Sequence, residues 1–197
     1  MWIEIAYIVG AYLIGSVTFA IVICKLSGSE DPRHAGSGNP GATNVARVGG
    51  WSAAAITFIG DTAKSAIPLG VALHLGIDDW VISGIALAVF LGHLFPVYHR
   101  FKGGKGVATY LGVLIGTQPV AALMWVGGWL ALVGIFRHSS IGGMTMCAVA
   151  PLLLWWQSAA YQLIAISVLM SVLVVIRHRQ NIKNLIAGTE GQDRTAD

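Results

Sequence analysis

The sequence is poor in charge and in cysteine. Only 11% of its 197 residues are Asp, Glu, Lys or Arg, against about 25% in a typical soluble domain. Its two cysteines, Cys24 and Cys147, lie in or beside apolar runs, which predicts free buried thiols rather than a disulfide framework. The six histidines and two cysteines show no H-x-x-H, C-x-x-C or HExxH spacing, and no G-x-S-x-G nucleophile elbow occurs. We therefore expect no metal and no cofactor.

What the chain has in abundance is apolar sequence: 55% of its residues are hydrophobic and the mean hydropathy is +0.71. Runs of this length predict membrane helices, and hence an all-α, polytopic membrane protein. Glu4 stands where a signal peptide would be basic, so we expect the first run to be retained. The fourth run is short, because its twelve residues rise about 18 Å against a hydrocarbon core of about 30 Å. We expect seven spans, at residues 2–24, 51–75, 80–97, 106–117, 120–136, 141–155 and 161–176.

Apart from Lys64, which lies inside the second run, and Arg194 in the tail, Lys and Arg fall in alternate connections between these runs or just after the last one. Cations fall at residues 25–47, 100–105, 137 and 177–183, and the other connections carry none. Because cytoplasmic loops are enriched in Lys and Arg, this predicts an outside N-terminus and a cytoplasmic C-terminus. Residues 1–186 would form a single transmembrane domain and residues 187–197 a short polar cytoplasmic tail. The formal charge of +3 then reflects topology, and we expect no nucleic-acid partner.

Three of the cationic segments are also rich in glycine or polar residues. In the first, residues 36–44 match G-x-G-x-x-G, but no strand precedes them, and Ala42-Thr43 replaces the Lys-Ser/Thr of a P-loop. Glycines still allow successive backbone N–H groups to surround an anion, and Arg47 adds a planar fork for phosphate. An ordinary solvated loop with turn residues is the alternative.

The second segment, residues 102–106, places two lysines among three glycines just before an expected helix, which again suits phosphate. A positive-inside turn that binds lipid headgroups is the alternative. In the third, Arg177 and Arg179 flank His178, and these cations disfavour its protonated form. A juxtamembrane basic anchor is the alternative there. His93, in the run at residues 80–97 that precedes the second segment, is either a packed residue or a catalyst.

Two opposite charges lie inside the second run. Asp61 and Lys64 share one helix face at i and i+3, where an unpaired charge would cost roughly 2.5–3.5 kcal/mol. They serve either as a structural pair or to orient a catalytic loop. Gly112 and Gly116 form G-x-x-x-G, which predicts close helix packing.

Taken together, these motifs resemble the bacterial acyl-phosphate:glycerol-3-phosphate acyltransferases, the PlsY family. The resemblance covers essentially the whole chain: G-S-G-N-x-G-A-T-N-x-x-R at residues 36–47, H-x-F-P-V then F-K-G-G-K-G-V-A-T at residues 93–109, and R-H-x-x-N-I ending in G-x-E at residues 177–190. Two positions depart from it. Ser65 stands where the family usually has Gly, and Asn184 where it often has Arg, so we assign Asn184 no phosphate role.

The resemblance implies transfer of a fatty acyl group from acyl phosphate to the 1-hydroxyl of sn-glycerol 3-phosphate. Lysophosphatidic acid and phosphate would be the products, in the first acylation step of phospholipid synthesis. The protein would lie among the lipids of the bacterial cytoplasmic (inner) membrane, with a cytoplasmic active face. A soluble enzyme that makes acyl phosphate would be its functional upstream partner.

The same resemblance and the chemistry of the residues give three groups of site residues. The expected catalytic residues are Ser37, Arg47, Lys105, His178 and Asn181. The expected substrate-binding residues are Gly36, Gly38, Asn39, Gly41, Thr43, Asn44, Lys102, Gly103, Gly104, Gly106, Arg177 and Glu190. Asp61, Lys64 and His93 are expected to support them.

Other readings remain open. An acyltransferase that uses acyl-CoA or acyl carrier protein would carry H-x-x-x-x-D, which occurs once, at residues 74–79, on a connection without Lys or Arg. We interpret that match as coincidence. An organophosphate transporter would bind its substrate near the midplane, whereas these motifs gather at one face, and an odd span count disfavours two equal inverted halves. A non-catalytic membrane scaffold would leave the composition of the loops unexplained.

Overall fold

The computed structural model describes residues 2–191, and this part of the chain is all helical. It contains no strand and forms nine α-helices and one short 3-10 helix. The helices are α1 (Trp2–Gly15), α2 (Phe19–Ser27), α3 (Ala42–His74), α4 (Asp79–Leu94), η1 (Val97–His99), α5 (Val107–Thr117), α6 (Pro119–Phe136), α7 (Ser139–Trp156), α8 (Tyr161–Arg177) and α9 (Arg179–Ile186). The all-α prediction is therefore confirmed for these residues.

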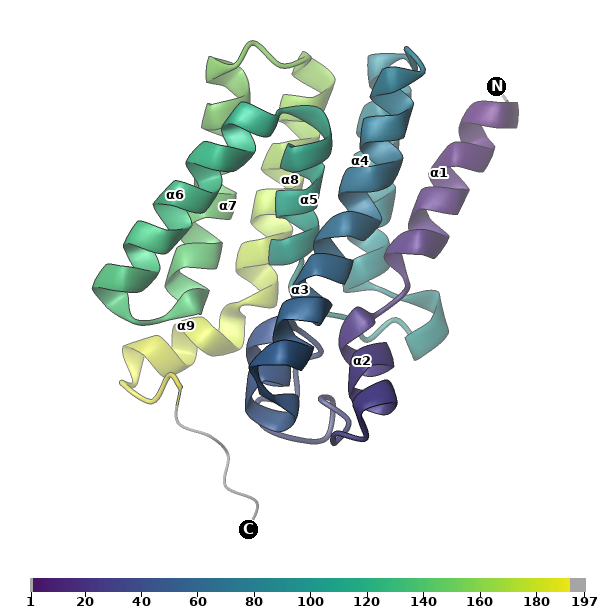
Figure 1. The fold of residues 1–197 in the computed structure, drawn as a ribbon. Coiled ribbons are helices and arrows are strands. Elements are labelled where there is room, and N and C mark those ends of the chain that lie inside the picture. Colours follow the sequence, from purple (N-terminus) through teal and green to yellow (C-terminus); the bar gives the residue numbers. More distant parts are fainter. Residues whose placement is uncertain (1, 192–197) are drawn as a thin grey trace.

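The long helices stand side by side in one bundle, and the long helices from α3 to α8 alternate in direction (Figure 1). The turns after α3, α5 and α7 lie at the upper end of the view, whereas α2 and α9 lie at the lower end. The core between the helices is apolar, and its largest fully buried side chains are Trp125, Tyr110 and Phe90. Tyr110 also meets Phe90 edge to face, which fixes α5 against α4.

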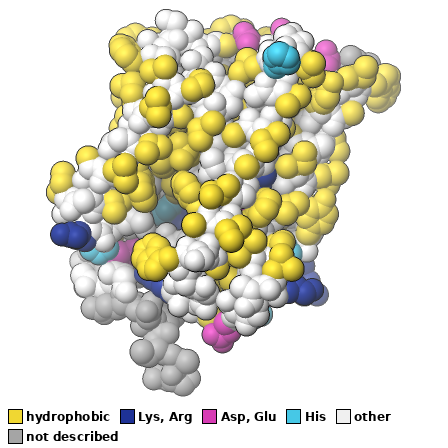
Figure 2. All heavy atoms as spheres, viewed as in Figure 1, with side chains coloured by type: hydrophobic (Ala, Val, Ile, Leu, Met, Phe, Trp, Pro, Cys, Tyr) yellow, Lys and Arg dark blue, Asp and Glu magenta, His cyan; other side chains and the backbone are white. Residues whose placement is uncertain are grey.

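Hydrophobic side chains also cover much of the outside. Figure 2 shows them over most of the visible face, while most of the visible Lys and Arg side chains gather toward the lower end. Three helical stretches are long and apolar enough to cross a membrane: Asp79–His99, which joins α4 to η1, Pro119–Phe136 and Ser139–Trp156. The number rises to five if each of two bent pairs, α1 with α2 and α8 with α9, is one span.

Two helix boundaries differ from the sequence-based prediction, and a third agrees with it. The first run, residues 2–24, breaks after Gly15, and α2 turns by 41° from α1. Helix α3 begins at Ala42, although Gly50, with φ of 81°, interrupts its helical backbone where the prediction placed the start of the span. Helix α5 has eleven residues, in agreement with the short fourth run.

Candidate active site

The first glycine-rich loop is organised by Asn44, at the start of α3. The buried Asn44 amide accepts a hydrogen bond from the backbone N–H of Ser37 at 2.8 Å and donates to the carbonyls of Pro32 and Ala35. Gly36 adopts φ of +57°, and a Cβ there would lie 2.3 Å from Asn44 Oδ1. Asn44, expected to bind substrate, thus holds the loop in shape, and the glycine permits its close approach.

Other residues of this loop lie at its surface. Ser37 and Gly38 are exposed, and Gly38 also has a positive φ of +71°. A Cβ on Gly41, which precedes α3, would meet the side-chain amide of Asn39 at 2.8 Å. Thr43 is near Ser139 of α7, with 3.4 Å between the hydroxyl oxygens. The loop therefore packs against the start of a distant helix as well as presenting Ser37 outward.

The second glycine-rich loop, residues 102–106, is held from both sides. The backbone N–H groups of Gly103 and Gly104 donate to the carbonyls of Leu94 and His93 at the end of α4. A Cβ on Gly103 would lie 2.0 Å from the His93 carbonyl oxygen, and one on Gly104 would lie 2.3 Å from His93 Nε2. Arg177 donates from its guanidinium to both glycine carbonyls. Gly106, with φ of +91°, then leads directly into α5.

Lys105 joins this loop to the third segment. Its ammonium donates to Oδ1 of Asn181 on α9, and the Asn181 amide donates to Glu190 Oε1 at 2.7 Å. Ser140 of α7 donates to the same carboxylate oxygen at 2.7 Å. Three segments far apart in the sequence therefore meet in one partly buried hydrogen-bonded chain, which we call the Lys105 chain (Lys105, Asn181, Glu190 and Ser140).

The charge on Lys105 is poised near neutral pH. Burial lowers the pKa of Lys105 to about 8; Glu190 opposes this, and Arg177 and Arg47 add to it. Arg47, exposed on α3, is thus within electrostatic reach of the chain. A partly buried ammonium near two arginines and one carboxylate has a net positive surrounding, which suits a phosphate ligand.

His178 lies between α8 and α9, buried beside the Lys105 chain. Its Nδ1 lies 2.8 Å from the carbonyl oxygen of Val174, so Nδ1 carries the proton in the neutral ring and Nε2 keeps its lone pair. Burial is the main cause that lowers the pKa of His178 to about 4, with Lys105 and Arg177 contributing. The ring is therefore neutral at physiological pH, as its charged neighbours predict.

Asp61, Lys64 and His93 form a second cluster beneath the loops, which we call the buried triad. Lys64 Nζ lies 2.7 Å from Asp61 Oδ1 and 2.9 Å from His93 Nδ1, and it donates to the carbonyl of Val17 at 2.8 Å. Val17 is in the break between α1 and α2, so the triad ties this break to α3 and α4. Through His93 it also supports Gly104.

The glycine pair on α5 packs as expected. A Cβ on Gly112 would meet the Thr62 carbonyl and Ser65 Oγ at 2.1 Å, and one on Gly116 would meet the Ala66 carbonyl at 2.7 Å. Ser65 donates to the Thr109 carbonyl at 2.8 Å, so this departure from the family pattern has a place in the contact between α3 and α5. The prediction of helix packing is confirmed.

A cleft of about 980 Å³ opens between the two glycine-rich loops and the junction of α8 with α9. Six of the predicted site residues line it: Ser37, Gly38, Asn39, Lys102, Gly103 and Arg177. Sequence reasoning missed its remaining basic residues, which are Arg33, His34, His99, Arg100 and Arg179. They lie in the cation-rich segments of the sequence. This clustering of cations was visible in the sequence, but it indicates a cytoplasmic loop as well as a binding site.

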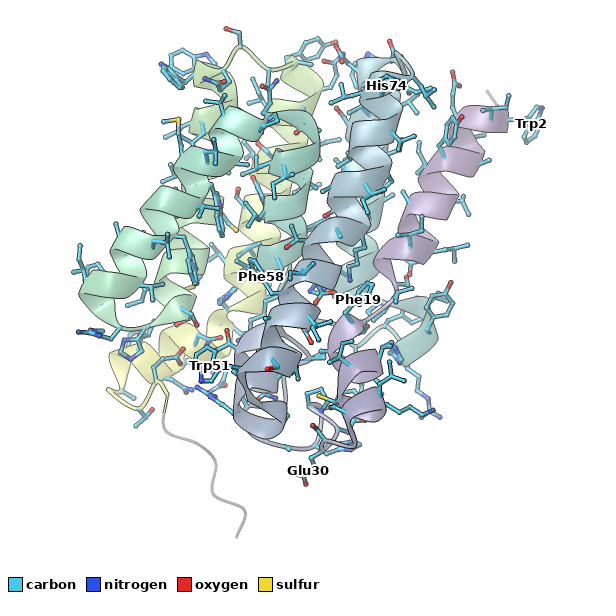
Figure 3. The ribbon with its side chains drawn as sticks, viewed as in Figure 1. Trp2, Phe19, Glu30, Trp51, Phe58 and His74 are labelled. Atoms are coloured by element: carbon cyan, nitrogen blue, oxygen red, sulfur yellow. The ribbon has the colours of Figure 1, made fainter. Side chains whose placement is uncertain are left out.

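The structure thus places most of the predicted residues in the cleft, in or beside the Lys105 chain, or in the buried triad, while Gly36, Gly41, Thr43 and Asn44 belong to the first loop itself. The H-x-x-x-x-D match begins at His74, which lies at the end of the bundle opposite Glu30 and Trp51 (Figure 3). Within residues 2–191, no group of three His, Cys, Asp or Glu side chains is arranged to hold a metal ion.

Comparison with known proteins identifies the family. Residues 5–188 match the family described as "Glycerol-3-phosphate acyltransferase". Glycerol-3-phosphate acyltransferases of Thioalkalivibrio sulfidiphilus and Halorhodospira halophila are 47% and 46% identical over 190 residues, which cover 96% of this chain and 94% and 96% of the relatives.

Two solved structures share the fold. They are crystal structures of PlsY (YgiH), an integral membrane glycerol 3-phosphate acyltransferase, in its glycerol 3-phosphate and lysophosphatidic acid forms. The TM-scores are 0.91 and 0.86, the identities 40% and 38%, and the alignments cover 95% of this chain and 94% and 93% of those chains. This chain therefore belongs to the glycerol-3-phosphate acyltransferases and is an integral membrane enzyme of the PlsY type.

Proposed function

We propose that this enzyme transfers a fatty acyl group from acyl phosphate to the 1-hydroxyl of sn-glycerol 3-phosphate, releasing lysophosphatidic acid and phosphate. The observation that carries the proposal is the meeting of the second and third polar segments at Lys105, with Arg47 of the first within electrostatic reach, next to a cleft lined by cations. Both proposed substrates carry phosphate, and the relatives with 40% and 38% identity were crystallised with glycerol 3-phosphate and lysophosphatidic acid.

The proposed chemistry is a direct attack within a ternary complex. The glycerol oxygen bonds to the acyl carbonyl carbon, the bond from that carbon to the phosphate oxygen breaks, and the hydroxyl proton passes to the departing phosphate. Because acyl phosphate is a mixed anhydride with a good leaving group, no acyl-enzyme is required. The protein then contributes positioning and charge stabilisation.

The residues divide this work as follows. Ser37 and the first glycine-rich loop hold one phosphate, while Arg47 and Lys105 neutralise phosphate charge. Asn181 orients glycerol phosphate or the tetrahedral oxyanion, and its hydrogen bond to Glu190 supports that placement. The low pKa of His178 makes it a weak base, so its Nε2 accepts a hydrogen bond from the glycerol hydroxyl without removing the proton.

We further propose seven membrane spans, with the N-terminus outside and the C-terminus and active face cytoplasmic, in the bacterial inner membrane. The alternating helix directions in Figure 1 and the gathering of cationic segments at one end support this arrangement. Residues 1–186 form the transmembrane domain and residues 187–197 a polar tail, of which residues 192–197 lie outside the described residues. A soluble enzyme supplies the acyl phosphate.

The test is an assay of the purified chain in detergent with palmitoyl phosphate and glycerol 3-phosphate, without CoA, carrier protein or metal. We expect phosphate and lysophosphatidic acid to appear at equal rates, and both to be lost in Lys105→Ala. Product from acyl-CoA but none from palmitoyl phosphate would reject the proposed donor. Passage of unchanged, labelled glycerol 3-phosphate into vesicles, without product, would instead indicate a transporter.

A further inference from the structure

Part of the lining of the 980 Å³ cleft, which we call the outer wall (Tyr98, Arg100, Phe101 and Arg179), has no part in the chemistry proposed above. Lys105, Asn181, His178 and Glu190 do not line the cleft, whereas Arg100 and Arg179 do. Lys102, Arg177 and Arg33 add three more cations, of which Arg33 is paired with Asp31; no acidic side chain within residues 2–191 lines the cleft. The cleft therefore has a strongly positive potential that is separate from the Lys105 chain.

Two neighbouring residues of this wall hold an unfavourable backbone conformation. Arg100 and Phe101 have φ of 52° and 60°, in the left-handed region that glycine adopts without cost. A non-glycine residue is strained in this region, and such strain concentrates at binding sites. The turn is closed by the hydrogen bond from the Phe101 N–H to the Pro96 carbonyl at 2.9 Å. Glycine would form the same turn without this strain. We therefore infer that the Arg100 and Phe101 side chains have a role beyond forming the turn.

The same wall is partly apolar. Tyr98 and Phe101 are 56% and 57% exposed, and Phe95 and Ile176 line the cleft beside them. The guanidinium carbon of Arg177 lies 5.8 Å from the centre of the Phe95 ring. Aromatic side chains combined with cations are typical of the membrane–water interface, where an acyl chain passes from hydrocarbon to a charged headgroup. The cleft thus has one surface for a phosphate and one for the first carbons of a chain.

From these observations we propose that the outer wall of the cleft binds the phosphate headgroup of a single-chain lipid, either the acyl phosphate entering or the lysophosphatidic acid leaving. Arg100 and Arg179 contact the phosphate, and Tyr98 and Phe101 cover the start of the chain. This inference rests on the proposed function, and it assigns the lipid phosphate to a place separate from the Lys105 chain.

The chemistry of the cleft distinguishes this ligand from two others. Glycerol 3-phosphate has no chain to cover Tyr98 and Phe101. A bilayer phosphodiester such as phosphatidylglycerol carries one negative charge, whereas a phosphate monoester carries nearly two at neutral pH, because its second pKa is about 6. Arg33 also lines the cleft but is paired with Asp31; the other four lining cations have no lining carboxylate, which matches the greater charge.

The test is equilibrium binding of hexadecyl phosphate to the detergent-solubilised protein. We expect Arg100→Gln combined with Arg179→Gln to weaken binding at least tenfold. Lys183→Gln, an exposed cation on α9 that does not line the cleft, should leave it within twofold. In turnover, the same double variant should raise the KM for palmitoyl phosphate about tenfold and leave the KM for glycerol 3-phosphate within twofold.

A second variant tests the strained turn. Phe101→Gly relieves the left-handed backbone, so we expect unchanged or higher thermal stability, yet weaker binding of hexadecyl phosphate and unchanged binding of inorganic phosphate. Undiminished hexadecyl phosphate affinity in Phe101→Gly would remove the apolar wall from the proposal.

Three other outcomes would overturn the proposal. They are unchanged binding in the double variant, a rise in the KM for glycerol 3-phosphate in place of palmitoyl phosphate, and equal competition by phosphatidylglycerol or by inorganic phosphate. Equal competition by phosphatidylglycerol would indicate a site for bilayer headgroups, and equal competition by inorganic phosphate would indicate a site for free phosphate. Failure of the wild type to use palmitoyl phosphate, with hexadecyl phosphate binding intact and sensitive to Arg100 and Arg179, would reject the proposed donor alone.

Discussion

The buried triad and the Lys105 chain are built from similar groups, yet they differ in how completely those groups are enclosed. In the triad, the side chains of Lys64 and Asp61 are each 2% exposed, and Lys64 contacts Asp61, His93 and a backbone carbonyl. In the Lys105 chain, the lysine, the amide and the carboxylate are all partly exposed. An enclosed and satisfied network holds the fold, whereas an open one can exchange partners with a ligand.

Removing the cation of the triad should have the largest effect. Lys64→Ala leaves Asp61 as an uncompensated buried charge, and breaking such a pair costs about 3–5 kcal/mol. We expect loss of the folded protein or a large fall in unfolding temperature in detergent. The matched control is Lys64→Met with Asp61→Asn, which removes both charges and should recover much of the stability. Equal destabilisation by the single and double variants would show that the pair has no special role.

The same truncation in the open network should affect catalysis instead. Charge-assisted hydrogen bonds contribute about 1.5–3 kcal/mol, so Lys105→Ala should lower kcat/KM at least tenfold. Because Lys105 is partly exposed, the unfolding temperature should change little. Lys183→Ala provides the control for loss of a cation at the same end. A large loss of stability in Lys105→Ala, as in Lys64→Ala, would erase the contrast between the two networks.

Gly104 links the two networks and should give an intermediate result. A Cβ there would overlap His93 Nε2 at 2.3 Å, so Gly104→Ala displaces either the loop or the triad. We expect a stability loss of about 1–3 kcal/mol together with a several-fold fall in kcat/KM. Gly134→Ala, on α6 with no atom within 4 Å of the added Cβ, is the matched control. Wild-type kinetics in Gly104→Ala would show that catalysis does not depend on the contact between the second glycine-rich loop and the buried triad.

The pH profile should give the smallest effect. Since the pKa of Lys105 is about 8, its charge is lost as the pH rises through 8, and kcat/KM should fall there. Glu190 raises this pKa, so Glu190→Gln should move the alkaline limb to lower pH while keeping an acceptor for Asn181. Lys105→Arg, which stays charged, should remove the limb. An unchanged limb in both variants would exclude Lys105 as the titrating group.

The sequence predicts the helices of this fold well, because long apolar runs and alternating cations are properties of single segments. It fails at the break after Gly15, since an apolar run gives no sign that Lys64 will donate to the carbonyl of Val17. A contact across 47 residues of chain cannot be read from local pattern.

The site shows the same division. The distribution of Lys and Arg predicts that the three polar segments lie on the same side of the membrane, but it does not predict which side chains contact each other. Arg177 resembles a phosphate ligand in the sequence, whereas its guanidinium donates to the carbonyls of Gly103 and Gly104. Asn44 likewise binds its own loop. Arg100 and Arg179 lie in cation-rich segments, and local sequence cannot tell a cation that marks the cytoplasmic side from one that contacts a ligand.

The shortness of α5 has a consequence for how two unlike substrates meet. Its eleven residues rise about 17 Å, roughly half of a hydrocarbon core, and residues 102–106 take the place of the missing turns. In the proposed topology, the floor of the site is therefore sunk below the membrane surface. A water-soluble acceptor descends to a depth that a lipid donor reaches by lateral diffusion, so neither the donor nor the acylated product has to be pulled out of the bilayer into water.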